Sequence, residues 1–148
     1  MFRSIMSVLG LVMALAVSPA NSTERPPATL YKNPQCGCCE QYANYLRRNG
    51  FTVKVVPTHN LSLIRRQAGV NIPEKLEGCH TMFIDKYVVE GHVPLKTLDK
   101  LLTERPAIRG ISLPGMPDGS PGMTGQKTEP FTIYEIGSDA EPRVYATE

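Results

Sequence analysis

The sequence predicts an α/β fold whose elements follow the order β-α-β-α-β-β-α, with a loop and a β-hairpin added at the C-terminus. First, short runs rich in β-branched residues alternate with segments of helical periodicity. Second, a C-x-x-C pair, Cys36 and Cys39, stands where the first strand gives way to the first helix. Third, prolines and glycines gather after residue 106, where they disfavour regular structure.

The first three elements are a strand, a helix and a strand. Residues 28–31 (ATLY) begin a buried strand, and residues 32–37 (KNPQCG) form the loop that follows. Residues 38–49 have helical periodicity, and Gly50 is well placed to end the helix. Residues 51–56 (FTVKVV) alternate as a strand does. The residues that share one face of the helix are Tyr42, Tyr45 and Leu46.

A helix, a hairpin and a further helix come next. Asn60 can cap a short helix that runs through Ala68. Residues 81–85 (TMFID) and 87–90 (YVVE) form two strands, and the short connection between them predicts an antiparallel hairpin. Pro94 fits the first turn of a third helix that runs to about Thr103. Its apolar stripe consists of Leu95, Leu98, Leu101 and Leu102.

This order of elements, with C-x-x-C at the first strand–helix junction, predicts a thioredoxin-like domain at residues 28–106. A generic α/β sandwich is the alternative. We expect residues 107–148 to form a C-terminal extension. Within it, residues 111–123 (ISLPGMPDGSPGM) are expected to lack regular structure. Residues 131–136 and 143–146 are expected to form the closing hairpin.

The N-terminus has the pattern of a secretory signal peptide. Arg3 precedes an apolar run at 5–17, and Ser18-Pro19-Ala20 supplies the small residues that a signal peptidase needs, so cleavage is expected near Ala20. Thirteen apolar residues are short for a membrane span of about 20. We therefore expect residues 1–20 to be removed, residues 21–27 to form a polar leader, and the mature protein to be periplasmic.

Charge gives little sign of a macromolecular partner. Loss of Arg3 with the signal peptide lowers the formal net charge of the chain from +2 to +1, and there is no long Lys/Arg run. Nothing therefore points to nucleic acid or to an anionic membrane surface. We expect a monomer with no membrane attachment after signal cleavage.

Three of the four cysteines, Cys36, Cys38 and Cys39, lie within four residues. Exported proteins usually pair their cysteines, and a Cys36–Cys39 disulfide is feasible. It would leave Cys79 only Cys38 as a partner. At a helix N-terminus a thiol tends toward its thiolate form, which attacks disulfides and binds metals. Three thiols so close together suit a metal cluster, since thiolate sulfurs can bridge several ions.

The fourth cysteine is expected to face the other three. In thioredoxin-like folds the turn that enters the third strand lies beside the C-x-x-C loop and usually holds a cis-proline that keeps metals away. Here that turn is Gly78-Cys79-His80-Thr81, with no proline. If the fold is correct, four sulfurs and one imidazole converge.

Copper is the expected metal. Soft thiolates select Cu(I), zinc or iron–sulfur clusters, and Met116 and Met123, each in a Pro-Gly-Met repeat, favour copper because thioethers bind Cu(I) well. Zinc held by four cysteines is the main competing metal, in a structural site. His80 and His92 are candidate ligands that complete or tune the site. Which of the histidines and methionines bind is left open, as is the number of ions.

The runs LYKNPQCGCCEQYANYL, GCHTMFIDKYVVEGHVP and RPAIRGISLPGMPDGSPGM resemble the CopG-type copper-resistance proteins of Gram-negative bacteria. This resemblance covers residues 28–146 and implies a thioredoxin-like domain whose C-terminal extension contributes to metal binding. It further implies a cysteine-bridged cluster of several copper ions and interconversion of Cu(I) and Cu(II). The motif cysteines would be Cys36, Cys38 and Cys39, their partner Cys79, and the extension ligands Met116 and Met123.

Three functional hypotheses follow. The first is a periplasmic copper oxidoreductase of copper resistance, with Cys36 and Cys39 as the catalytic pair and copper-efflux or copper-resistance proteins as partners. The second is a thiol–disulfide oxidoreductase that uses the same pair without metal. The third is a copper store or chaperone without redox turnover.

Overall fold

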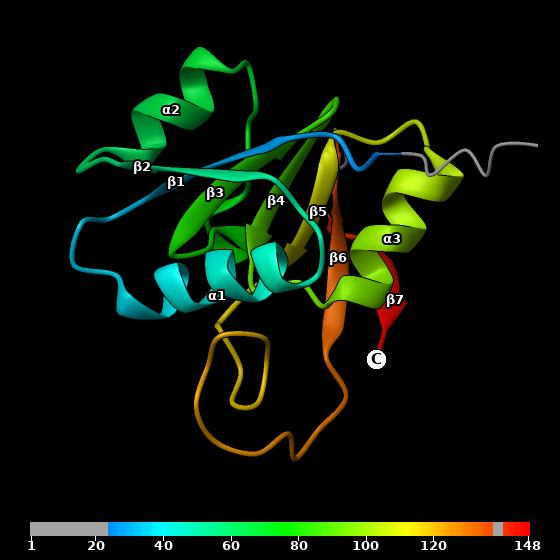
Figure 1. Ribbon diagram of the computed structural model, residues 1–148. Helices are drawn as coiled ribbons and strands as arrows, with labels where there is room; N and C mark the ends of the chain where they lie inside the picture. Colours follow the sequence, from blue (N-terminus) through cyan, green and yellow to red (C-terminus); the bar gives the residue numbers. More distant parts are fainter. Residues whose placement is uncertain (1–23, 138–140) are drawn as a thin grey trace, which may run out of the picture.

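The computed structural model describes residues 24–137 and 141–148, and the predicted signal peptide lies outside this part of the chain. One seven-stranded mixed sheet, in the order β2-β1-β3-β4-β5-β6-β7, runs through the described residues (Figure 1). The element order through α3 is the predicted β-α-β-α-β-β-α. The fold is therefore α/β as predicted, and its designation as thioredoxin-like stays a prediction.

The N-terminal half of the sheet brings the first and third strands together. β1 (Ala28–Lys32) pairs in parallel with β2 (Val53–Pro57) and antiparallel with β3 (His80–Ile84). β3 and β4 (Tyr87–Gly91) form the predicted hairpin, whose turn places Asp85 at a φ of 51°. In this register Lys32 lies opposite His80, so the ends of β1 and β3 meet just before the C-x-x-C loop.

The C-terminal extension continues the same sheet. β5 (Gly110–Leu113) pairs in parallel with β4, and β6 (Thr132–Ile136) and β7 (Val144–Thr147) close the sheet as an antiparallel pair. The closing hairpin was predicted, but β5 was not. The expectation that all of 111–123 lacks regular structure is wrong for 111–113. Prolines begin only at residue 114, and the apolar residues before it pair with β4.

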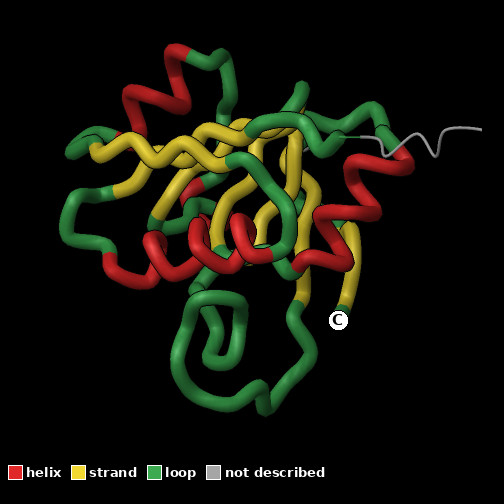
Figure 2. The backbone as a smooth tube through the Cα atoms, in the orientation of Figure 1, coloured by secondary structure: helices red, strands yellow, loops and turns green. Residues whose placement is uncertain are grey.

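Helices cover both faces of the sheet (Figures 1 and 2). α1 (Gly37–Arg48) and α3 (Leu95–Glu104) pack on one face, where they bury Tyr42, Leu46 and Leu98 in the main core. α2 (Leu61–Gln67) and the short 3-10 helix Glu74–Leu76 belong to the segment that covers the other face. Truncating a fully buried leucine such as Leu46 to alanine would destabilise such a core by about 2–5 kcal/mol.

The helix termini follow the predicted signals. Asn60 caps α2 by accepting a hydrogen bond from the Leu63 amide at 2.8 Å. Gly50 follows α1 at a φ of +83°, a conformation that glycine adopts without steric cost. Pro94 is the N-cap of α3 and so precedes the first turn in which it was expected. Among the described residues, no helix has the length and apolar character to cross a membrane.

Candidate metal centre

The start of α1 positions three sulfurs. Cys36 is the N-cap residue, and its Sγ accepts a hydrogen bond from the Cys39 amide at 3.3 Å. Cys38 and Cys39 lie in the first turn, where free backbone N–H groups favour negative charge. Cys39 is fully buried, whereas Cys36 and Cys38 are partly exposed.

Lys32, at the end of β1, holds the loop that carries Cys36. The side chain is 94 % buried, since its relative exposure is 6 %. Its Nζ donates to the carbonyl oxygens of Asn33, Pro34 and Cys36, each at 3.2 Å. The structure shows that it orients the loop, and its positive charge lies next to the cysteine motif.

Cys36 and Cys39 form a disulfide bond, so the structure represents the oxidised form of the protein. Cys38 and Cys79 are free thiols. The Cys38 Sγ lies 3.4 Å from the Cys36 Sγ. A site that uses all four sulfurs as thiolates therefore requires reduction of this disulfide, which takes two electrons and two protons.

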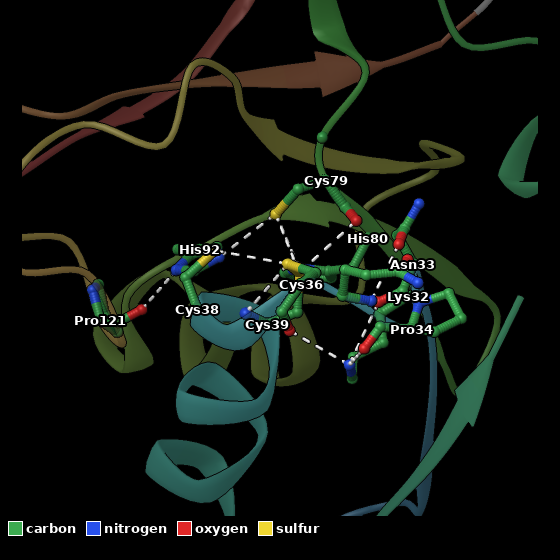
Figure 3. The surroundings of a disulfide bond; sticks show 12 residues. Lys32, Asn33, Pro34, Cys36, Cys38, Cys39, Cys79, His80, His92 and Pro121 are labelled. Atoms are coloured by element: carbon green, nitrogen blue, oxygen red, sulfur yellow. Dashed lines mark hydrogen bonds between the residues drawn. A yellow bond between two sulfur atoms is a disulfide. The ribbon is translucent and has the colours of Figure 1, made fainter. Parts of the chain in front are cut away.

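Cys79 faces the C-x-x-C loop, as predicted from the missing proline (Figure 3). It immediately precedes β3, and its Sγ lies 3.1 Å from the Cys39 Sγ. The same sulfur lies 3.5 Å from His92 Nε2 and 3.7 Å from His80 Nδ1. The peptide that enters β3 is trans, as are all peptide bonds in the described part of the chain.

Two overlapping groups of donor atoms result, and within each group the atoms lie no more than 4.8 Å apart. The first contains the four sulfurs of Cys36, Cys38, Cys39 and Cys79. The second contains the sulfurs of Cys39 and Cys79 with one ring nitrogen each from His80 and His92. Cys39 and Cys79 are common to both groups, which makes the cluster continuous.

The two imidazole rings are held in place by α1. Both stack on the ring of Tyr42, with centroid distances of 5.0 Å for His80 and 5.1 Å for His92. Tyr42 is itself fixed because its hydroxyl donates to the Val93 carbonyl oxygen at 2.9 Å. Tyr42 thus belongs to the main core and also supports both imidazole rings of the site.

A backbone contact from the extension sets the tautomer of His92. Its Nδ1 lies 2.7 Å from the carbonyl oxygen of Pro121. Because a carbonyl can only accept, Nδ1 carries the proton and Nε2 presents its lone pair toward Cys79. Histidine ligands of metals commonly donate their second ring N–H to a backbone carbonyl in this way.

Burial keeps both histidines neutral. It lowers the pKa of His80 to about 3, with a further contribution from His92, and it lowers the pKa of His92 as well. The Nε2 atom of His80 is buried without a hydrogen-bond partner, and its Nδ1 lies 3.7 Å from the Cys79 Sγ. Neutral imidazole is the form that binds metal ions.

The pKa of the Cys79 thiol is raised, whereas the pKa values of the two histidines are lowered. Burial raises its pKa to about 12, and the nearby Cys38 adds to the effect. Cys79 is therefore protonated at neutral pH, and a metal ion must displace this proton to bind its sulfur.

The extension seats its Pro-Gly-Met loop against α1. A Cβ on Gly122 would lie 2.6 Å from the Tyr42 backbone nitrogen, so only glycine permits this close approach. Met116 and Met123 are both half-buried in the loop, and their assignment as ligands stays a prediction. His59 is exposed, and Met82 lies in the main core.

Sequence analysis missed a buried ionic network behind the site. Arg65 donates to Glu90 at 2.8 Å and to the Gly78 carbonyl at 3.2 Å, and the Gly78 amide donates to Glu90 at 2.8 Å. Thr81 also donates to Glu90, at 2.6 Å. The network clamps the two backbone segments that carry Cys79 and His92. A glutamate at the end of the apolar run YVVE was the available signal.

Comparisons with known proteins agree with this geometry. A family described as "Protein of unknown function, DUF411" matches residues 76–123. No curated protein matches. Two solved structures, both titled as copper resistance protein CopG (forms 2 and 1), share 32% sequence identity with this chain at a TM-score of 0.74. Each alignment covers 84% of this chain, and 99% and 98% of the respective solved chains.

Proposed function

Because this chain belongs to the family of the copper resistance protein CopG, we propose that it binds several copper ions and interconverts Cu(I) and Cu(II). The ligands would be the thiolates of Cys36, Cys38, Cys39 and Cys79, assisted by His80 and His92. Met116 and Met123 would bind from the Pro-Gly-Met loop. Copper is the substrate and cargo of this site.

One observation carries the proposal. Four sulfurs from two segments 40 residues apart lie within 4.8 Å of one another, beside two neutral imidazoles. Packing of the core alone does not explain why four cysteine sulfurs lie so close together. Thiolates select Cu(I), while imidazole also suits Cu(II), so the mixed set provides donors for both oxidation states.

The Cys36–Cys39 disulfide can accept the electrons that copper releases. Each Cu(I) that becomes Cu(II) releases one electron, and reduction of the Cys36–Cys39 disulfide to two thiols consumes two electrons and two protons. Two copper ions therefore balance one cysteine pair. The reverse direction reduces two Cu(II) ions and restores the disulfide.

The proposal includes export to the periplasm as a monomer that exchanges copper with efflux or resistance proteins. The signal-peptide pattern at 1–20 supports export. Edman sequencing of the protein purified from whole cells would test cleavage near Ala20, and an N-terminus at Met1 would contradict export by this route.

A Cu(I) titration of the reduced protein, without oxygen and against a competing chelator, tests the site. We expect more than one copper per chain and a visible spectrum that changes reversibly on admission of air. Cys79→Ser should lower the copper stoichiometry, whereas His59→Ala, an exposed histidine away from the site, should leave it unchanged. An unchanged stoichiometry and spectrum in Cys79→Ser would contradict a four-sulfur site.

A second candidate is a metal-independent thiol–disulfide oxidoreductase, and the Cys36–Cys39 disulfide favours it. This function predicts reduction of a model disulfide such as insulin in the presence of a copper chelator, with little loss in Cys38→Ser. The copper function predicts weak activity of this kind and a large loss of copper in Cys38→Ser. Copper binding without catalysed Cu(I) oxidation would instead identify a store or chaperone.

A further inference from the structure

We propose that the oxidised protein keeps a smaller donor set within the same cluster, in which Cys79, His80 and His92 bind one divalent ion while Cys36 and Cys39 are joined by their disulfide. The disulfide would thus select between two sets of donors, four sulfurs when reduced and one sulfur with two nitrogens when oxidised. The inference deepens the proposed copper function, on which it rests, by giving the oxidised state a ligand of its own.

The disulfide removes only part of the donor set. With Cys36 and Cys39 joined, the thiolates that remain available are those of Cys38 and Cys79. Of these two, Cys79 belongs to the group of donors that includes both histidines, and Cys38 does not. In the disulfide form the Sγ of Cys79 already lies 3.5 Å from His92 Nε2 and 3.7 Å from His80 Nδ1.

The three side chains are already oriented toward a common ion. Pro121 holds the proton on His92 Nδ1, so the free lone pair of Nε2 faces Cys79. Tyr42 supports both rings from below, and the ring centroids of His80 and His92 lie 5.3 Å apart. A site built from rigid strands and packed rings needs little reorganisation on binding.

The two donor sets differ in softness and in charge. Four thiolates are soft and carry four negative charges, which suits several Cu(I) ions. One thiolate with two neutral imidazoles carries a single negative charge and suits Cu(II) or Zn(II). Three protein ligands leave a coordination position open, as in sites that exchange ligands rather than serve structure.

Co(II) alone is a suitable probe, since it does not exchange electrons with thiols as Cu(II) does. The mature protein would be kept in the disulfide form, verified by two free thiols per chain, and titrated with Co(II) without oxygen. We expect one Co(II) per chain and a thiolate-to-cobalt charge-transfer band. Cys79→Ser should abolish the band and weaken binding by more than the roughly tenfold to hundredfold that loss of a hydrogen-bond partner of a ligand typically costs.

Cys38→Ser is the matched control, because it removes the other free thiol and leaves the disulfide intact. It should retain both the band and the stoichiometry. Zn(II) K-edge X-ray absorption of the oxidised wild-type protein avoids any variant that fails to fold, and it should show one sulfur and two imidazole ligands. No Co(II) binding, a band that survives in Cys79→Ser, or a band lost in Cys38→Ser would overturn the proposal.

The experiment separates this inference from the proposed function. If the oxidised protein binds no Co(II) but the reduced protein binds several Cu(I) ions, the inference of a smaller donor set is wrong and the copper function stands. If the reduced protein binds no Cu(I), the proposed function fails, whatever the outcome with Co(II).

Discussion

Among single residues, Cys79 has the chemistry that sequence reasoning described least well. The helix-start argument for thiolates applies to Cys36, Cys38 and Cys39, whereas Cys79 precedes a strand and is protonated because burial raises its pKa to about 12. Its proton therefore leaves only when a metal ion, or attack on the neighbouring disulfide, provides compensation. The Cys79 sulfur therefore stays in its less reactive thiol form until a metal ion binds.

Slow alkylation of Cys79 is the first prediction. The thiolate is the reactive form, and an unfolded cysteine has a pKa of about 8.5. In the Cys38→Ser variant with the disulfide intact, Cys79 is the single thiol. At pH 8 iodoacetamide should modify it more slowly in the folded protein than in urea, because burial, the largest cause of the raised pKa, does not depend on Cys38. Mass spectrometry gives both rates.

The pH profile separates protonation from simple shielding. If the raised pKa controls the reaction, the rate in the folded protein should still rise about tenfold per pH unit above pH 8.5, where the rate in the unfolded protein levels off. A rate that does not depend on pH, or equal rates in the folded and unfolded protein, would contradict this account of Cys79.

Lys32 provides the second prediction at this scale. Its buried ammonium group lies beside Cys36 and favours negative charge on the reduced motif. Lys32→Met should therefore make the Cys36–Cys39 disulfide harder to reduce, lowering its potential on the order of 30 mV, a tenfold change in equilibrium constant. Equilibration with glutathione buffers measures this. Lys32→Arg keeps the charge, so its disulfide should have a potential close to that of the wild-type protein. An unchanged potential in Lys32→Met, or an equally lowered potential in Lys32→Arg, would contradict the electrostatic role.

At the scale of elements, the site depends on segments that the fold joins from far apart in the chain. α1 supplies three cysteines and Tyr42, the segments entering β3 and leaving β4 supply Cys79 and His92, and the extension supplies Pro121. The Arg65–Glu90 network holds together the segment that enters β3 and the segment that leaves β4. Removing one partner of such a buried pair typically costs about 3–5 kcal/mol, because the remaining charge stays buried and uncompensated.

Docking of the Pro-Gly-Met loop gives a prediction with a close control. Gly115 and Gly122 both have a left-handed backbone, with φ of +77° and +83°. A Cβ would meet nothing within 4 Å at Gly115, but would clash with the Tyr42 backbone at Gly122. Gly122→Ala should therefore displace the loop, release His92 from Pro121 and weaken copper binding about tenfold or more.

Gly115→Ala carries the same backbone strain without the clash, so it should lower the melting temperature slightly and leave the copper affinity unchanged. Chelator competition measures the affinity, and thermal unfolding measures the stability of each variant. Equal copper affinities in the two variants would show that the loop does not need this contact with α1.

Most helices and strands could be predicted from the sequence, and the features that could not be predicted were missed for physical reasons. Local signals fixed the helix ends at Gly50 and Asn60 and the hairpin around Asp85. β5 was missed because it is four residues long and its partner β4 lies about 20 residues away in the chain. Arg65 and Glu90 were missed because charged residues are usually exposed. Only tertiary contacts reveal that each compensates the other.

At the scale of the whole molecule, the proposed boundary at residue 106 does not interrupt the sheet. β5 pairs with β4, and the main core contains Ile111, Leu113 and Ile133 from the extension beside Met82 and Val89 from the N-terminal part. We therefore propose that residues 28–106 and 107–148 are distinct in sequence character and one unit in folding.

Truncation tests this unity. A chain that ends at Arg105 loses three strands, exposes the edge of β4 and leaves the apolar face beneath α3 uncovered. We expect it to lack a cooperative thermal transition by circular dichroism and to aggregate. A sharp transition with native-like secondary structure would show that residues 28–105 fold without the extension.

The central claim is that the reduced protein holds a cluster of copper ions bridged by its four cysteine sulfurs. Copper K-edge X-ray absorption of the reduced, Cu(I)-loaded protein tests this most directly, because it reports the ligand atoms and any neighbouring metal. The account predicts a first shell dominated by sulfur and a short copper–copper vector. A shell of nitrogen and oxygen, or sulfur without a copper neighbour, would contradict it.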